Sequence, residues 1–239
     1  MIEALAFLTI LPARARARSP GRGALLAFPL VGLLVGGAWA GTAWGARSVW
    51  GALAAAGLVM LVDLLITGGL HLDALADLVD GLASRRPAAE AVAIMRDSRI
   101  GAVGAAGLGV ALLLRFAFVA SLVTAGKWGA VVLVPVAGRF AMVWVMTRSR
   151  SVSDVSLASG PCAAATPGVG IGAGVGALVL GGLIGWWPGI AAMALAGVSA
   201  EVCAAFFRRR FGALVGDTIG AAGSLAELLT LAFLSAVVV

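Results

Sequence analysis

Apolar residues form seven long runs in this chain, separated by short stretches in which arginine and aspartate gather. Each run holds roughly 20 residues, the length that an α-helix needs to cross the hydrocarbon core of a bilayer. The pattern therefore predicts an all-α bundle of seven membrane-spanning helices and one membrane domain over residues 1–239. The runs cover residues 24–46, 49–70, 101–125, 128–147, 168–186, 189–206 and 218–239.

The composition supports this interpretation. Of the 239 residues, 62% are hydrophobic and 12% are charged, and the mean hydropathy is +1.08. A soluble domain needs far more polar residues on its surface, and disordered chains are much less apolar. Two cysteines cannot build a disulfide scaffold. The net charge of +6 would suggest nucleic acid as a partner of a soluble protein, but here the arginines indicate topology, and the lipid bilayer is the predicted partner.

The basic residues are distributed very unevenly about the predicted spans. Thirteen lie on one side, two on the other, and two inside spans. Because cytoplasmic loops carry the excess of arginine and lysine, the N-terminus is predicted to be cytoplasmic and the C-terminus external, in a bacterial cytoplasmic membrane. The thirteen are Arg14, Arg16, Arg18, Arg22, Arg85, Arg86, Arg96, Arg99, Arg148, Arg150, Arg208, Arg209 and Arg210.

Two other patterns concern packing at the membrane. The apolar segment 2–11 is half a span long and is ended by Pro12, which predicts an interfacial or re-entrant piece. Glycines recur at four-residue steps, which predicts close helix packing through small residues. Cys162 and Cys203 fit no metal or disulfide pattern and receive no role. The glycine series are Gly37, Gly41, Gly45; Gly168, Gly172, Gly176; and Gly212, Gly216, Gly220.

Candidate chemistry is concentrated in a predicted cytoplasmic catalytic loop, residues 68–100. Asp73, Asp77 and Asp80 have the spacing i, i+4, i+7, which places three carboxylates on one face of a helix, opposite a face of leucines. Carboxylate oxygens suit Mg²⁺, and two such ions can clamp a phosphoryl displacement. An acidic surface without a ligand is the alternative. His71 falls on the leucine side, as a packing or a catalytic residue.

Two further cytoplasmic segments carry groups that suit phosphate chemistry. The sequence MRDSRIG at residues 95–101 sets Arg96 and Arg99 on either side of Asp97. These guanidinium groups either bind diphosphate oxygens in a bidentate manner or anchor the chain at the membrane surface. Near the C-terminus, Asp217 follows three consecutive arginines, so a fourth carboxylate can converge on the acidic face.

A few ionisable residues lie within the predicted spans, where charges default to functional or paired roles. Similar depth makes Arg139–Glu227 and Arg139–Asp63 the plausible pairs, as a structural lock or as the floor of a polar cavity. Glu201 lies at a similar depth. Arg115 has no obvious partner in the sequence.

Several of these motifs resemble one family, the cobalamin synthases, which are adenosylcobinamide-GDP ribazoletransferases. The resemblance covers nearly the whole chain. It rests on TGGLHLDALADLVDG, IMRDSRIGAVG and RRRFGALVGDTIGA, and on FLTILPAR and FPLVGLLVG near the N-terminus.

The resemblance implies a membrane enzyme of cobalamin biosynthesis that needs Mg²⁺. Such an enzyme joins adenosylcobinamide-GDP to α-ribazole, or to its 5′-phosphate, and releases GMP. Further copies of the chain and other cobalamin-assembly enzymes are candidate partners. Asp97, His71 and a metal-bound water are alternative acceptors of the hydroxyl proton. The predicted metal ligands are Asp73, Asp77, Asp80 and Asp217; the predicted catalytic residues are Asp97, His71, Arg96 and Arg99; the predicted substrate-binding residues are Arg85, Arg139, Arg209 and Arg210.

Two other functions stay open. Residues 77–85 resemble the first half of the CDP-alcohol phosphotransferase signature, although its second half is missing. The ionisable residues within the spans would also suit a transporter, but the chain has no internal repeat and its acidic cluster lies at the predicted surface.

Overall fold

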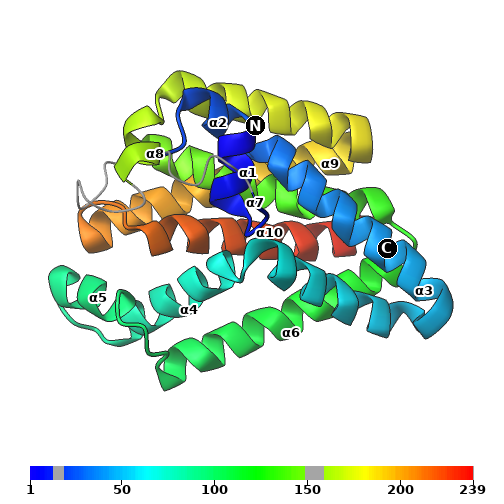
Figure 1. The fold of residues 1–239 in the computed structure, drawn as a ribbon, viewed down its shortest axis with the longest axis horizontal. Coiled ribbons are helices and arrows are strands. Elements are labelled where there is room, and N and C mark those ends of the chain that lie inside the picture. Colours follow the sequence, from blue (N-terminus) through cyan, green and yellow to red (C-terminus); the bar gives the residue numbers. More distant parts are fainter. Residues whose placement is uncertain (13–18, 149–158, 239) are drawn as a thin grey trace.

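The computed structural model describes residues 1–12, 19–148 and 159–238, and this part of the chain is all-helical (Figure 1). The all-α prediction is confirmed. Arg14, Arg16, Arg18 and Arg150, which entered the topology prediction, lie outside the described residues. The ten helices are α1 (Ile2–Leu8), α2 (Arg22–Leu26), α3 (Phe28–Thr67), α4 (Leu70–Ala83), α5 (Ala88–Met95), α6 (Ala102–Thr124), α7 (Trp128–Arg148), α8 (Ser159–Ala164), α9 (Pro167–Phe211) and α10 (Gly216–Val238).

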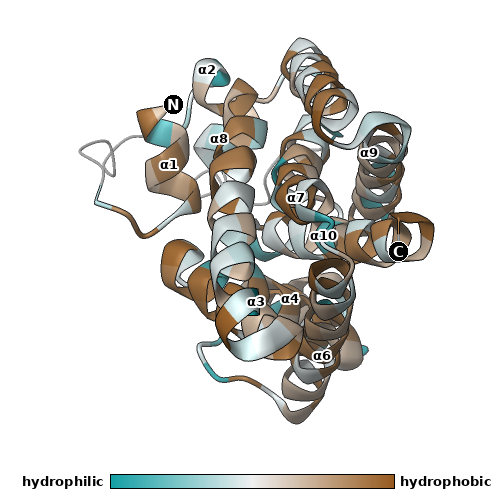
Figure 2. Cartoon of the chain, turned by 90° about the vertical axis from the view of Figure 1, so that its right-hand side faces the viewer, coloured by the Kyte–Doolittle hydropathy of each residue, from teal (hydrophilic) through white to brown (hydrophobic). Residues whose placement is uncertain are grey.

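Five of these helices, α3, α6, α7, α9 and α10, are long and apolar enough to cross a membrane. Hydrophobic residues predominate along them (Figure 2), and many large apolar side chains are exposed, Leu113 and Leu183 among the most. A soluble protein would not expose so much apolar surface. The structure therefore supports a multi-pass membrane protein with five long apolar helices among the described residues, and the seven spans stay a prediction.

The difference arises because α3 and α9 each contain two of the predicted runs. With 40 and 45 residues, they would be about 60 and 68 Å long if straight, roughly twice the hydrocarbon thickness. Each has one residue with non-helical backbone angles, Gly51 (φ 81°) in α3 and Trp186 (φ 49°) in α9. Glycine adopts this conformation freely, whereas for tryptophan it is strained.

Helices α3 and α9 each double back along their length (Figure 1). Trp39 and Asp63 each lie twelve residues from Gly51, yet both contact Arg115: its guanidinium lies 5.6 Å from the Trp39 ring, and its Nη1 lies 3.0 Å from Asp63 Oδ2. In α9, the backbones at Gly181 and Gly189 leave no room for a Cβ atom between them. Eight residues would span about 12 Å in a straight helix, so α9 is a helical hairpin, as α3 is.

Helix α7 occupies the centre of the bundle, with nearly all its side chains from Ala130 to Met146 buried. Gly32 and Gly36 of α3 lie against its backbone near Pro135, where a Cβ atom would clash. Small residues allow this close approach, which strengthens dispersion contacts between helices in lipid. The glycine-packing prediction is wrong for most of the predicted positions. Of the nine glycines in the three series, only Gly172 and Gly220 have a close neighbour, and a Cβ atom at the other seven would meet open space.

A buried ionic network joins four helices in the middle of the bundle. Glu227 of α10 accepts hydrogen bonds from Arg115 of α6 and Arg139 of α7, and Arg115 also pairs with Asp63 of α3. All four side chains are less than a tenth exposed. The expected Arg139–Glu227 pair is confirmed, and the structure supplies partners for Arg115. Two positive and two negative charges balance, which limits the cost of burying them.

The short N-terminal helix α1 packs onto the end of α3. Ala4 and Leu8 are fully buried, and the Ile10 N–H donates to the Ile66 carbonyl at 2.8 Å. This contact holds the N-terminal segment beside the start of α4, where the predicted chemistry lies. The interfacial placement of residues 2–11 stays a prediction.

Candidate functional site

Helix α4 carries the predicted acidic face. It begins after two consecutive glycines with left-handed backbone, Gly68 (φ 66°) and Gly69 (φ 74°), which let the chain turn sharply out of α3. Leucine and alanine side chains on one side of α4 are buried in the bundle, whereas Asp73 is exposed and Asp77 and Asp80 are half-buried on the other side. The helix and its two faces are confirmed.

Asp80 connects the acidic face to the start of α6. Its two carboxylate oxygens accept the backbone N–H groups of Gly101 and Gly104, each at 2.7 Å. A Cβ atom at either position would displace the Asp80 carboxylate, and at Gly104 it would also meet the Ala76 carbonyl oxygen. This capping satisfies two N–H groups at the end of α6 that have no partner within the helix. Each oxygen keeps a second lone pair, so Asp80 can still bind a cation.

The four predicted metal ligands lie close enough to affect one another electrostatically. The pKa of Asp77 is raised to about 6, first by partial burial and then by the negative charges of Asp73, Asp217 and Asp80. Asp217 comes from the first turn of α10, which fits closely against α4 because a side chain at Gly220 would collide with Ala74. The expected convergence of Asp217 on the acidic face is therefore seen in the structure.

The donor set suits Mg²⁺, although the described residues hold no group of three His, Cys, Asp or Glu side chains already arranged around an ion. Mg²⁺ usually keeps several waters and takes one or two carboxylates together with substrate phosphates. The carboxylates on α4 repel one another, and α4 itself carries no lysine or arginine. A divalent cation would relieve this repulsion. The residues present therefore fit this metal.

The crowding at Asp77 has a measurable consequence for stability. Because its pKa is raised from about 4 to about 6, the ionised form opposes folding above pH 6, and this opposition fades as the pH falls from 7 towards 4. Without divalent cations, Asp77→Asn should therefore raise the melting temperature at pH 7.5, and the gain should shrink at pH 5. Glu90→Gln, at an exposed position on α5, is the matched control. A gain that is independent of pH would contradict the assignment.

Asp97 and Arg99 form a surface ion pair just before α6. The Asp97 carboxylate accepts the Arg99 backbone N–H at 3.0 Å and its guanidinium Nη2 at 2.7 Å. These hydrogen bonds lower the pKa of Asp97 to about 2. Arg96 lies near the acidic face, since its charge acts on Asp217. Arg96 therefore lies beside Asp217, while the Asp97 carboxylate is held by Arg99.

His71 lies on the inner side of α4, as the helical wheel predicts. Its side chain is buried, its Nε2 has no hydrogen-bond partner in the described structure, and Ser224 donates to its carbonyl at 2.8 Å. Burial and the charges of Arg139 and Arg115 lower the pKa of its imidazole. The neutral imidazole of His71 thus lies on the inner side of α4, close to the two arginines of the buried ionic network.

The predicted substrate-binding arginines fall into two places. Arg85 and Arg209 are exposed, and Arg210 donates from Nη2 to the Arg86 carbonyl at 2.7 Å, so the end of α9 meets the connection between α4 and α5. Arg139 is buried in the ionic network instead. The sequence used Arg86 only as a marker of the cytoplasmic side, but its contact with Arg210 places it at the site.

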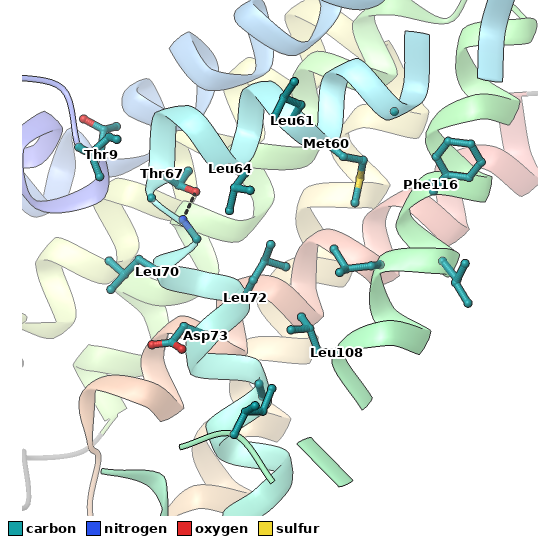
Figure 3. Close-up of a pocket in the computed structure, with 18 of the residues that line it drawn as sticks. Thr9, Met60, Leu61, Leu64, Thr67, Leu70, Leu72, Asp73, Leu108 and Phe116 are labelled. Carbon is teal, nitrogen blue, oxygen red and sulfur yellow. Dashed lines mark hydrogen bonds between the residues drawn. The ribbon is translucent and has the colours of Figure 1, made fainter. Parts of the chain in front are cut away.

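A large cavity adjoins the acidic face, and no sequence pattern indicated it. It has a volume of about 1000 Å³ and lies between the second half of α3, the start of α4 and α6 (Figure 3). Asp73 lies at one end, near Thr67, whose hydroxyl accepts the Gly69 N–H at 3.3 Å. The rest is lined by apolar side chains, among them Leu64, Leu72 and Leu108 in Figure 3. The N-terminal residues Phe7, Thr9 and Ile10 also line it, so the lining comes from three stretches of the chain, residues 7–10, 57–76 and 100–116, which only the tertiary structure brings together.

The fold and the site define a class: a polytopic helical membrane protein with carboxylates and arginines gathered at one end of the bundle, suited to metal-assisted chemistry on phosphates. Comparison with known proteins gives the particular family. A family model described as cobalamin-5-phosphate synthase matches residues 1–235. The chain belongs to this family, and is thus an enzyme of cobalamin biosynthesis.

Individual relatives agree along nearly the full length. An adenosylcobinamide-GDP ribazoletransferase from Roseiflexus sp. (strain RS-1) is 37% identical over 98% of this chain and 88% of its own length. The protein of the same name from Geotalea daltonii is 36% identical over 98% of this chain and 96% of its own. No solved structure matches the fold. This membership favours the ribazoletransferase interpretation over phospholipid synthesis and transport.

Proposed function

We propose that this protein transfers the adenosylcobinamide phosphate group from adenosylcobinamide-GDP to the 5′-hydroxyl of α-ribazole or α-ribazole 5′-phosphate. The hydroxyl oxygen bonds to the phosphorus next to cobinamide, the bond from that phosphorus to the GMP oxygen breaks, and GMP leaves. The observation that carries the proposal is the convergence of Asp73, Asp77, Asp80 and Asp217 from two helices, in a chain of this family.

Each group at the site has a role in this reaction. Asp73, Asp77, Asp80 and Asp217 would hold Mg²⁺, which supplies positive charge to the diphosphate. The other roles fall to the surrounding arginines and to Asp97. Arg96 and Arg99 bind phosphate oxygens, and Arg85, Arg209 and Arg210 extend this positive surface; Arg139 supports it from inside the bundle.

Asp97 is the group placed to accept the hydroxyl proton. With a pKa near 2 it is ionised but a weak base while Arg99 donates to it. When Arg99 turns to a substrate phosphate, Asp97 loses these hydrogen bonds and becomes more basic. His71 is buried beneath the acidic face, so it positions α4 rather than contacting the hydroxyl.

Reconstitution tests the proposal directly. Purified protein in lipid, given adenosylcobinamide-GDP, α-ribazole and Mg²⁺, should release GMP in step with a cobalamin product, and chelation should stop both. CDP-diacylglycerol with a small alcohol should give no CMP, and sealed vesicles should accumulate no labelled cobinamide. Release of CMP alone, or uptake without nucleotide release, would overturn the proposal in favour of lipid synthesis or of transport.

We also propose seven membrane crossings, in which α3 and α9 each cross twice. The turn at Gly51 and the α6–α7 connection lie at the same end of the bundle, since Arg47 donates to the Thr124 carbonyl at 3.0 Å and lies 5.8 Å from the Trp128 ring. A second cavity is lined both by the α6–α7 connection and by Trp186, where α9 turns, so this turn lies at the same end. Exposed tryptophans at this end suit the membrane–water interface. The acidic site lies at the other, cytoplasmic end.

Reporter fusions check this topology. A fusion at residue 90 should report the cytoplasm and a fusion after Val239 the external side, because arginine is concentrated at the site end. A fusion at residue 126 serves as a second external control. If residue 90 and the C-terminus report the same side, the seven-crossing arrangement is wrong.

A further inference from the structure

The cavity beside Asp73 is large for a membrane protein of this size. Its volume of about 1000 Å³ is at the upper end of the range of small-molecule pockets, about 300–1,000 Å³. On the α3 side it extends from Gly57 to Thr67, ten residues or about 15 Å of helix. It opens sideways between α3 and α6, where Leu61, Leu64 and Leu113 are exposed.

The two ends of this groove differ in chemistry. At the α4 end lie the Asp73 carboxylate and the Thr67 hydroxyl, whereas Met60 and Phe116 lie toward the opposite end (Figure 3). Asp73 belongs to both the groove and the acidic face. A molecule that fills the groove therefore reaches the carboxylates that would hold the metal and the diphosphate.

We propose that this groove binds the corrinoid half of the donor substrate. This inference rests on the proposed function, in which a diphosphate joins a nucleoside to a bulky macrocycle. The phosphorus under attack is the one next to cobinamide, so the macrocycle must lie directly beside the acidic face. The groove has the required volume and position. The second cavity, of about 440 Å³, lies at the far end of the bundle around Gly126 and Trp186.

The apolar lining fits this occupant. The faces of a corrin ring offer a broad surface for contact with leucine side chains, and the polar groups at its rim can point toward Thr9, Thr67 and Asp73, the polar side chains of the lining. In this arrangement the macrocycle contacts apolar side chains of α3 and α6 while the nucleotide stays at the surface. An acyl chain of a bilayer lipid is the competing occupant.

Filling the groove tests the proposal. Leu64→Trp and Leu108→Trp add bulk on its α3 and α6 sides, and Val198→Trp adds the same bulk at an exposed position of α9 away from it. Equilibrium dialysis with adenosylcobinamide, read from its visible absorbance, and with GDP measures the two halves of the donor separately. Leu64 is half-exposed, so its variant carries the test if Leu108→Trp does not fold, as judged by gel filtration and thermal unfolding.

Both groove variants should bind adenosylcobinamide at least about tenfold more weakly, because overpacking costs roughly this much in affinity. Binding of GDP, and binding of both ligands by Val198→Trp, should match wild type. Unchanged adenosylcobinamide binding by a folded groove variant would overturn the proposal. If such a variant differs from wild type only in its dependence on added lipid, the groove holds a lipid acyl chain instead. If wild type binds adenosylcobinamide in the groove yet releases no GMP, the proposed function fails while the groove assignment stands.

Discussion

Asp73→Ala and Asp77→Ala should each reduce Mg²⁺-dependent turnover by at least about 100-fold, because they remove oxygens that would hold the charge opposite the diphosphate. Both variants should insert and fold normally. Within residues 1–12, 19–148 and 159–238, neither carboxylate makes a hydrogen bond, and the removal of either relieves repulsion on α4. Turnover is measured as GMP release in lipid vesicles over a range of Mg²⁺ concentrations.

Asp80→Ala should behave differently from its two neighbours. Its loss leaves the Gly101 and Gly104 N–H groups without their acceptor, so stability should fall by about 2 kcal/mol in addition to the loss of turnover. Glu90→Ala on α5 is the control with one carboxylate fewer and no expected effect on turnover. Near-normal turnover in all three aspartate variants at saturating Mg²⁺ would exclude this face as the metal site.

Glu227→Gln is expected to cause the largest loss of stability in the bundle. It leaves Arg139 without a counter-charge and Arg115 with Asp63 alone, inside the membrane part of the protein. Removing one partner of a buried ion pair costs about 3–5 kcal/mol. The exposed pair Arg86–Glu90, at 3.6 Å, is the matched comparison, and Glu90→Gln there should cost less than about 1 kcal/mol.

A double variant separates lost charge balance from lost packing. Arg139→Met with Glu227→Leu removes one positive and one negative group together, and leaves the Arg115–Asp63 pair at 3.0 Å. Because an apolar replacement of a buried pair is often close to neutral, the double variant should recover most of the stability. Thermal unfolding in one fixed lipid mixture measures all the variants. A double variant as unstable as Glu227→Gln would show that the network acts through specific hydrogen bonds rather than charge balance.

Local patterns in the sequence were sufficient to predict the helical segments, the acidic face and the family of this protein. The seven apolar runs correspond to helical segments of the structure, because the length of an apolar run and the lack of water in a bilayer leave the α-helix as the stable form. The spacing of Asp73, Asp77 and Asp80 fixed their common face, since helical periodicity alone sets this geometry. The motifs also indicated the family, and with it the reaction.

Other features depend on contacts between distant segments, which no local pattern encodes. The reversals at Gly51 and Trp186 merged neighbouring runs into hairpins, and Gly37, predicted to pack against another helix, faces outward. The partners of Arg115 come from residues 52 and 112 positions away in the chain. The groove exists only because α3, α4 and α6 diverge beside Asp73. Periodicity determined which side of each helix is apolar, and tertiary packing decided which apolar sides meet and which enclose a cavity, because that choice depends on how side chains from different helices fit together.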